Sequence, residues 1–278
     1  MTTVNEALRT AAEHLSNTSD TARLDAEVLM AHALGVSRSE MLLRHGRDEA
    51  PASFAALVER RARYEPVAYI TGSQDFYGRA FHVSSAVLIP RGDSETAVAA
   101  ALETRPGARR VLDCGTGSGA LLLTLLAELP EATGIGTDRS PAALAVAQGN
   151  AGALGLETRA RFREADWTRP GWADGLGEFD IVIANPPYVE DSAQLDPAVR
   201  DYEPHGALFA GRDGLEDYRS LIPQLPALLA PDGVAVLEIG HEQDRAVSAI
   251  AGAAGFTCEL RRDLAGRPRV LVLRSAHR

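Results

Sequence analysis

The chain contains no lysine: the 28 residues counted as Lys or Arg are all arginine. A lysine Schiff base or a lysine general base is therefore excluded from its chemistry. Only two cysteines occur, Cys114 and Cys258, which are too few for a disulfide framework or a zinc site. We therefore expect no metal centre, and the low cysteine content is typical of a protein of the reducing cytoplasm.

Long apolar runs are also missing, and because Met1 to Thr10 has neither a basic nor an apolar segment, we expect no secretory signal. No apolar stretch approaches the roughly 20 residues that cross a bilayer, so we expect no membrane partner. The formal net charge of −10 is opposite to what affinity for many phosphates requires. We therefore expect no direct sequence-specific binding of nucleic acid. The cluster Arg60-Arg61-Ala62-Arg63 leaves a local basic patch open, although such a cluster is usually a solvated helix face.

The composition changes twice along the 278 residues, which suggests three segments. Residues 1–65 are rich in Ala, Leu, Glu and Arg with apolar residues at helical spacing, which predicts a small helical domain. Residues 66–90 turn to aromatic and β-branched residues around Gly72 and Gly78, which predicts a connecting β-hairpin. Residues 91–278 alternate strand-like and helix-like stretches, the pattern of an α/β, doubly wound sheet.

Seven strands and four clear helices are expected in the third segment. The predicted strands are Arg110 to Asp113, Gly134 to Asp138, Ala160 to Glu164, Asp180 to Ala184, Val234 to Ile239, Thr257 to Arg261 and Val270 to Leu273. The predicted helices are Ala120 to Glu128, Pro141 to Ala153, Leu215 to Leu229 and Glu242 to Ala254. Ser140 followed by Pro141 is a typical start of a helix.

A glycine-rich turn joins the first strand to the first helix of this pattern. It consists of Gly115, Thr116, Gly117, Ser118 and Gly119. Glycines there let a ligand approach the backbone, and the free N–H groups of a helix start attract an anion. The same residues also satisfy the dinucleotide pattern, so a nicotinamide enzyme remains an alternative, and a simple tight turn is the bland one.

Two further strand ends carry polar or aromatic residues. Asp138 closes the second strand and can accept hydrogen bonds from ribose hydroxyls, although capping the next helix would also explain it. Asp166 and Trp167 follow the third strand and could bracket an adenine, although Trp167 could equally be a core residue. Together with the glycine turn, these residues predict a pocket for an adenosine with a short charged tail.

The fourth strand ends in Asn185-Pro186-Pro187-Tyr188. Ligands of open α/β sheets bind beyond the carboxyl ends of the strands, so this motif should face a substrate. Its prolines lack N–H donors, which leaves carbonyl groups and the Asn185 side chain to hold polar hydrogens, while Tyr188 offers a flat face. Such a site suits a planar NH2 group, as in a carboxamide or a base amine. An ordinary strand-ending turn is the alternative.

With these motifs, the chain resembles the HemK/PrmC family of release-factor glutamine N5-methyltransferases. Further likeness lies at Pro66 to Gly72, Phe76-Tyr77-Gly78, Val87 to Arg91, Glu203-Pro204, Asp213-Gly214-Leu215 and Leu237 to Gly240. The family commonly has Arg-Pro-Glu-Thr-Glu where this chain has Arg91-Gly92-Asp93-Ser94-Glu95, so a rigid proline is lost here.

The resemblance implies a Rossmann-like class I methyltransferase that uses S-adenosyl-L-methionine and acts in translation termination. Its partners would be class I peptide chain release factors, methylated on the glutamine of a Gly-Gly-Gln loop, with residues 1–65 gripping the protein substrate. The catalytic residues would be Asn185, Pro186 and Tyr188, and the same three residues together with Pro187 would bind the substrate. The cofactor would be held by Gly115, Thr116, Gly117, Ser118, Gly119, Asp138, Asp166, Trp167 and Asn185.

Three other functions remain open at this stage. An adenine-N6 nucleic-acid methyltransferase meets the same geometric demand, because Asn-Pro-Pro-Tyr also occurs there, but the acidic balance argues against it. A ribosomal-protein glutamine methyltransferase is a nearer alternative. A catalytically silent binding module is the third, and the intact motifs count against it. The helical segment could also serve stability or dimerisation.

Overall fold

The computed structural model describes residues 2–276 and divides the chain into two compact units. The first unit comprises the chain up to Ser73 together with Leu195–Tyr202, and the second comprises Gln74–Gln194 and the chain from Glu203 onward. The sequence patterns give no sign of this return to the first unit. Within residues 2–276, no helix combines the length and the apolar character that a membrane crossing requires.

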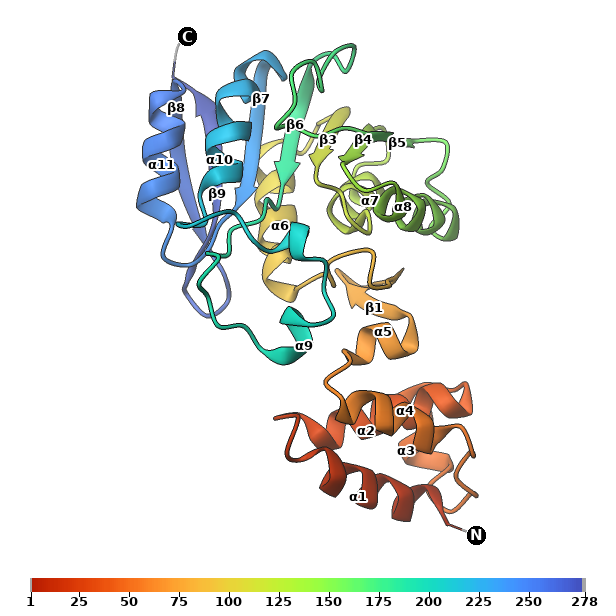
Figure 1. Ribbon diagram of the computed structural model, residues 1–278. Helices are drawn as coiled ribbons and strands as arrows, with labels where there is room; N and C mark the ends of the chain where they lie inside the picture. Colours follow the sequence, from red (N-terminus) through yellow and green to blue (C-terminus); the bar gives the residue numbers. More distant parts are fainter. Residues whose placement is uncertain (1, 277–278) are drawn as a thin grey trace. The chain divides into compact units, whose positions relative to one another are not determined.

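The first unit is built from short helices (Figure 1). They are α1 (Val4–Leu15), α2 (Ala22–Leu34), α3 (Arg38–Arg44), α4 (Phe54–Ala62), α5 (Val67–Thr71) and α9 (Pro197–Arg200). Thr3 begins α1 with a capping box, in which its hydroxyl accepts from the Glu6 N–H and the Glu6 carboxylate accepts from the Thr3 N–H. The breaks between these helices fall where Gly, Ser, Asn, Asp and Pro cluster in the sequence.

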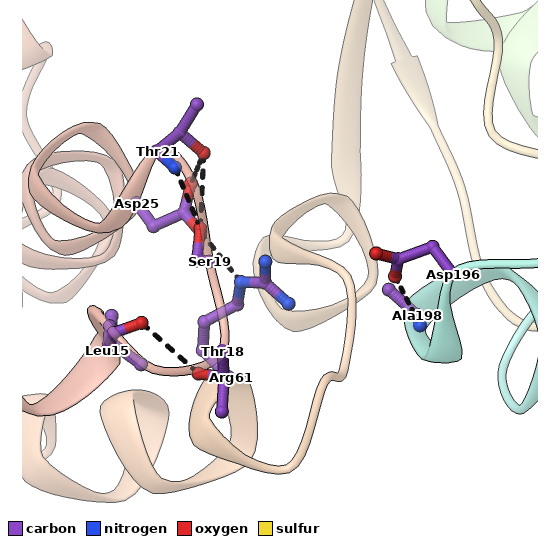
Figure 2. A network of polar contacts seen from close by, with 8 residues as sticks. All are labelled: Leu15, Thr18, Ser19, Thr21, Asp25, Arg61, Asp196 and Ala198. Atoms are coloured by element: carbon purple, nitrogen blue, oxygen red, sulfur yellow. Dashed lines mark hydrogen bonds and ion pairs between the residues drawn. The ribbon is translucent and has the colours of Figure 1, made fainter.

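A polar network ties α2 to α4 inside the first unit (Figure 2). Asp25 of α2 accepts hydrogen bonds from the Ser19 hydroxyl at 2.7 Å, the Thr21 hydroxyl at 2.8 Å and Arg61 Nε at 2.7 Å. The side chains of Asp25 and Arg61 are only 10% and 12% exposed. Arg60 pairs with Glu65 at 2.8 Å. The Arg60–Arg63 cluster is therefore partly a set of structural ion pairs.

The hairpin is shorter than the segment from which it was predicted. Its strands are β1 (Ser73–Phe76) and β2 (Arg79–His82), whereas Val67–Thr71 forms helix α5. Pro66 has the extended conformation that precedes a helix, and Gly72 ends α5 in the left-handed conformation. Aromatic and β-branched residues do not distinguish a five-residue helix from a strand, so the predicted hairpin wrongly included Val67–Thr71.

The second unit contains the predicted sheet (Figure 1). Its strands lie in the order β5-β4-β3-β6-β7-β9-β8, with β9 antiparallel to both of its neighbours. Their bounds are β3 (Arg110–Cys114), β4 (Thr133–Asp138), β5 (Ala160–Glu164), β6 (Phe179–Ala184), β7 (Leu229–Glu238), β8 (Phe256–Arg262) and β9 (Pro268–Ser275). All seven predicted strands are present, and most of their ends differ from the predicted ones by only one or two residues.

Helices cover both faces of this sheet, which confirms the doubly wound architecture. They are η1 (Gly92–Ser94), α6 (Glu95–Thr104), α7 (Ala120–Glu128), α8 (Pro141–Ala153), η2 (His205–Ala207), α10 (Glu216–Leu221), η3 (Ile222–Ala227) and α11 (Asp244–Ala253). Successive strand residues enter opposite cores: Val111 and Ile181 pack with α6 and α7, whereas Leu112 and Val182 pack with α10 and α11. Near-continuous apolar strands are therefore required.

The predicted helix from Leu215 to Leu229 was wrong in its second half. The α-helix α10 ends at Leu221, the 3-10 helix η3 follows, and Leu229 already begins β7. Pro223 and Pro226 lack the N–H groups that an α-helix needs at these positions, and a proline ring also crowds the preceding turn. The tighter 3-10 turn accommodates both prolines.

We predict that Asp25→Ala destabilises the first unit by about 3 kcal/mol, because the largely buried Arg61 charge would remain without its carboxylate partner. Urea unfolding followed by circular dichroism measures the change. Asp20→Ala, at an exposed position in the same loop, is the control and should change stability by less than about 0.5 kcal/mol. Equal midpoints for the two variants would contradict this role of Asp25.

Candidate active site

A cavity opens at the carboxyl ends of β3, β4, β5 and β6. Nine of the residues that the sequence assigns to the site line this cavity: Gly115, Thr116, Gly117, Ser118, Asp138, Asp166, Trp167, Asn185 and Pro187. Gly119, Pro186 and Tyr188 do not line it. The cavity wall also contains residues from the 86–94 and 204–207 segments, among them Arg91, Ser94 and Gly206.

The glycine loop, residues 115–119, is a tight turn held against β4. The N–H groups of Gly115 and Thr116 both donate to the Thr137 carbonyl, at 2.8 and 2.9 Å. Gly117 has a φ of +54°, and a Cβ atom there would meet nothing within 4 Å. Its backbone therefore borders open space. At Gly115 a Cβ atom would lie 3.0 Å from the Trp167 ring, so glycine there allows the indole to approach.

Asp138 connects the end of β4 to both neighbouring loops. One carboxylate oxygen accepts from the Gly117 N–H at 3.0 Å, and the other accepts from the Ser140 N–H at 2.9 Å. Ser140 in turn caps α8 by accepting from the Ala143 N–H at 3.2 Å. Asp138 thus fixes the glycine loop and the turn into α8. Each carboxylate oxygen can accept a second hydrogen bond, so acceptor capacity remains for a ligand.

Asp166 and Trp167 sit beyond β5 and both line the cavity. One oxygen of Asp166 is occupied by Thr168, accepting from its hydroxyl at 2.6 Å and its N–H at 3.0 Å. The indole N–H of Trp167 donates to the Asp217 carboxylate at 3.0 Å. Trp167 is therefore neither fully buried nor free: it packs against the apolar core, lines the cavity and is anchored through its indole N–H.

The Asn-Pro-Pro-Tyr motif follows β6 directly, and Ala184 pairs with Cys114 of β3. The Tyr188 carbonyl accepts from the Gln243 side-chain amide at 3.0 Å, which fixes the far end of the motif. Burial raises the pKa of the Tyr188 hydroxyl to about 12, with the nearby Glu238 carboxylate as the next contribution. Tyr188 is therefore neutral at ordinary pH. Within the motif, Asn185 and Pro187 line the cavity.

Comparison with known proteins identifies this arrangement. Residues 6–72 match the PrmC N-terminal domain, and residues 107–245 match a methyltransferase domain. A release factor glutamine methyltransferase from Cereibacter sphaeroides is 43% identical over 277 residues, covering 97% of each chain. Another from Rhodospirillum rubrum is 43% identical over 259 residues, covering 91% of this chain and 78% of that protein. The chain belongs to the release factor glutamine methyltransferase family.

The resemblance inferred from the motifs is thus confirmed, and the protein is an S-adenosylmethionine-dependent methyltransferase. A solved methyltransferase from Pyrococcus furiosus shares the fold, with a TM-score of 0.53, 17% identity, and coverage of 77% of this chain and 97% of that one. The expected Rossmann-like class I fold is therefore confirmed as well. The individual site residues rest on the geometry described above.

Two buried acids of this methyltransferase were not assigned to the site from the sequence. The Asp113 side chain is buried next to the glycine loop. One of its oxygens accepts a hydrogen bond from the Thr116 hydroxyl at 2.7 Å, and the other has no hydrogen-bond partner. Burial raises the pKa of Asp113 to about 7. Its signal in the sequence is an acid inside an apolar strand, directly before the glycines.

Glu238 holds the corresponding place at the end of β7. Its neighbour Leu237 pairs with Ala184, so Glu238 lies beside the start of the Asn-Pro-Pro-Tyr motif. It is 1% exposed, its Oε2 has no hydrogen-bond partner, and burial raises its pKa to about 7, against the opposing influence of the Ser94 hydroxyl and Arg269. In the sequence, Glu238 lies inside the predicted strand Val234 to Ile239, and an acid within an apolar strand is its only signal.

Two arginines of the cavity wall tie its loops together. Arg91 pairs with the buried Glu203, whose second oxygen accepts from the Ile89 N–H at 3.2 Å. Arg139, directly after Asp138, donates to the Gly206 carbonyl. These contacts hold the 203–207 segment at the cavity. Glycine in place of the family proline at position 92 begins the short η1 helix, in which Ser94 is buried.

We predict that Glu238→Gln gains stability relative to the wild-type enzyme as the pH rises from 4.5 to about 7. The folded-state pKa of about 7 lies above the ordinary value of 4.5, so the stability contribution of protonated Glu238 is complete below pH 4.5 and is lost as the pH rises through 7. Glutamine cannot ionise and avoids this loss, which amounts to about 3 kcal/mol at most.

Denaturant unfolding of both proteins between pH 4.5 and 8 measures the difference. Glu242→Gln is the matched control, because it removes the same charge from a side chain that is 87% exposed. A stability difference between Glu238→Gln and wild type that stays constant over this range would contradict the buried, proton-binding state of Glu238.

Proposed function

We propose that this enzyme transfers a methyl group from S-adenosylmethionine to the side-chain amide nitrogen (N5) of the glutamine in the Gly-Gly-Gln loop of class I peptide chain release factors. One observation carries the proposal: Asn185 and the glycine loop line the same cavity. Curated relatives that span nearly the whole chain are named release factor glutamine methyltransferases. The product would be S-adenosylhomocysteine, and the enzyme would act in the cytoplasm, where translation ends.

The cavity residues fit an adenosine that carries a charged tail. Open space borders the backbone at Gly117, Asp138 retains acceptor capacity for ribose hydroxyls, and Trp167 offers a flat face for a purine. When bound, S-adenosylmethionine supplies a methyl group attached to a positively charged sulfur. We assign its binding to the glycine loop, Asp138, Trp167 and Asn185. Asp166 contributes less, because Thr168 already occupies one of its oxygens.

The amide of the substrate requires precise placement, because its nitrogen lone pair is delocalised and is a poor nucleophile. We assign the Asn185 side-chain oxygen and the Pro186 carbonyl as acceptors for the two amide hydrogens, which would aim the nitrogen at the methyl group. Tyr188 would pack on the amide plane. Since Pro186 and Tyr188 do not line the cavity, Asn185 is the residue on which the assignment chiefly depends.

Acceptor oxygens also assist the transfer itself. As the new N–C bond forms, positive charge develops on the nitrogen, and oxygens already aimed at its hydrogens stabilise that charge without rearranging. The departing proton becomes more acidic at the same time, so a strong general base is unnecessary. Tyr188, with a pKa of about 12, stays protonated and contributes its ring rather than a charge.

The helices up to Ser73 would recognise the protein substrate. This part of the proposal is supported by the match of residues 6–72 to the PrmC N-terminal domain, separate from the methyltransferase match at 107–245. A protein substrate needs more recognition than a single amide provides, because a side-chain carboxamide occurs on every glutamine and asparagine.

A direct assay tests the proposed substrate. The purified enzyme is incubated with methyl-labelled cofactor and one of three acceptors: a release factor, the same factor with its loop glutamine replaced by alanine, or adenine-containing DNA. Label confined to the intact release factor is the expected result. Label in the DNA, or equal label in the alanine variant, would overturn the proposal.

We predict that Asn185→Ala lowers kcat by about 100-fold or more, because the acceptor that orients the amide is lost. Most of the cofactor affinity should remain, because the glycine loop, Asp138 and Trp167 still hold the cofactor. Single-turnover methylation and calorimetric titration with S-adenosylhomocysteine measure the two effects separately. Gln148→Ala, which removes an exposed amide from α8, serves as the control. Turnover by Asn185→Ala at the wild-type rate would discard the role assigned to Asn185.

A further inference from the structure

Trp167 is held in place by three side chains that lie outside the cavity. Asp217 accepts from the indole N–H at 3.0 Å, while the Ser220 hydroxyl and the Gln224 amide donate to the Trp167 carbonyl at 3.3 and 2.9 Å. None of the three lines the cavity. The indole N–H and the backbone carbonyl of Trp167 are thus both fixed by the consecutive helices α10 and η3.

These three residues, here called the α10 bracket, share one face of α10 and η3. Their spacing of three and four residues places Asp217, Ser220 and Gln224 in line along the helix. Gln224 also donates to the Ser220 carbonyl at 2.7 Å and accepts from the Trp172 indole N–H at 2.6 Å. The bracket therefore binds the 167–172 loop at both of its tryptophans.

We infer that the α10 bracket positions Trp167 for cofactor binding, with Asp217 as its main positioning residue. The inference rests on the proposed function, because it takes the cavity as the nucleoside site. A half-buried carboxylate is a strong acceptor for an indole N–H, and a ring whose edge is fixed loses little freedom when a purine packs on its face. Asp217 would set the cofactor affinity without contacting the cofactor.

The electrostatics around Asp217 agree with a structural acceptor. Burial raises its pKa, while the Trp167 hydrogen bond and Arg139 lower it, and Glu216 and Asp166 raise it again. Glu216 is exposed on the same helix. It therefore offers a carboxylate one position away that does not accept the indole hydrogen bond of Trp167.

Three variants separate positioning from a general effect on the fold. Asp217→Ala removes the acceptor, Asp217→Asn retains an oxygen that can accept from the indole, and Glu216→Gln removes one charge next to it. Affinity for S-adenosylhomocysteine is measured by calorimetry, and KM and kcat by methylation of a release factor. Asp217→Leu takes the place of the alanine variant if that variant does not fold.

The expected result is about a tenfold loss of affinity in Asp217→Ala, the loss typical of a hydrogen bond to a charged group. KM for S-adenosylmethionine should rise by a similar factor, with kcat at saturation changed less than about twofold. Asp217→Asn should recover most of the affinity, and Glu216→Gln should match the wild type. Wild-type affinity in a folded Asp217→Ala variant would overturn the inference.

A double-mutant cycle tests whether Asp217 acts through Trp167. Phenylalanine has no N–H, so Asp217→Ala should cause no further loss of affinity in a Trp167→Phe enzyme. Equal losses in both backgrounds would show that Asp217 acts by another route and would overturn the inference. If the wild-type enzyme binds S-adenosylhomocysteine but methylates no release factor, the proposed substrate is wrong, while the cycle still decides the role of Asp217.

Discussion

The alignment of three parallel strands is the constraint on which the site depends. β3 lies between β4 and β6, with Cys114 opposite Thr137 on one side and Ala184 on the other. The next residues along each strand therefore emerge at one edge of the sheet, where the glycine loop, Asp138 and Asn185 meet. A slip of one residue would turn every side chain to the opposite core, and two different apolar cores oppose that slip.

Rigidity beyond the sheet comes from polar contacts between segments distant in sequence. Gln243 fixes the Tyr188 carbonyl, and Gly214 approaches that carbonyl so closely that a Cβ atom would lie 2.3 Å from it. Val189 forms an isolated bridge with Phe209 just beyond the motif. These contacts fix the backbone at the end of the Asn-Pro-Pro-Tyr motif. In the proposed mechanism, a backbone held in this way would keep the Asn185 and Pro186 acceptors in place as charge develops on the substrate nitrogen.

The sequence predicted most of the sheet and placed together most of the residues that line the cavity, because both follow from local patterns. Apolar strands buried on two faces, a glycine turn before α7 and the Ser140-Pro141 start of α8 all have signals within a few residues. Pro223 and Pro226 are also local signals, because neither proline fits the interior of an α-helix. The short helix α5 was missed, because five residues carry too little periodicity.

Contacts across long separations could not be predicted in the same way. Trp167 and Asp217 are 50 residues apart, and nothing near either residue indicates the other. The unpaired oxygens of Asp113 and Glu238 likewise depend on what packs around them, although an acid inside an apolar strand is a detectable signal. The Asn-Pro-Pro-Tyr motif was placed correctly at a strand end, but only the fold shows that Tyr188 lies outside the cavity lining.

The discontinuity of the first unit has a consequence for biosynthesis. The Tyr202 hydroxyl donates a hydrogen bond to the Arg63 carbonyl at 2.7 Å, although the two residues are 139 positions apart in the sequence. During translation the ribosome releases α1 to α5 well before it makes α9, and four strands of the sheet are synthesised in between. At about 5 to 20 residues per second this interval lasts on the order of ten seconds. During that time the helices α1 to α5 lack α9 as a packing partner and are accessible to chaperones and proteases.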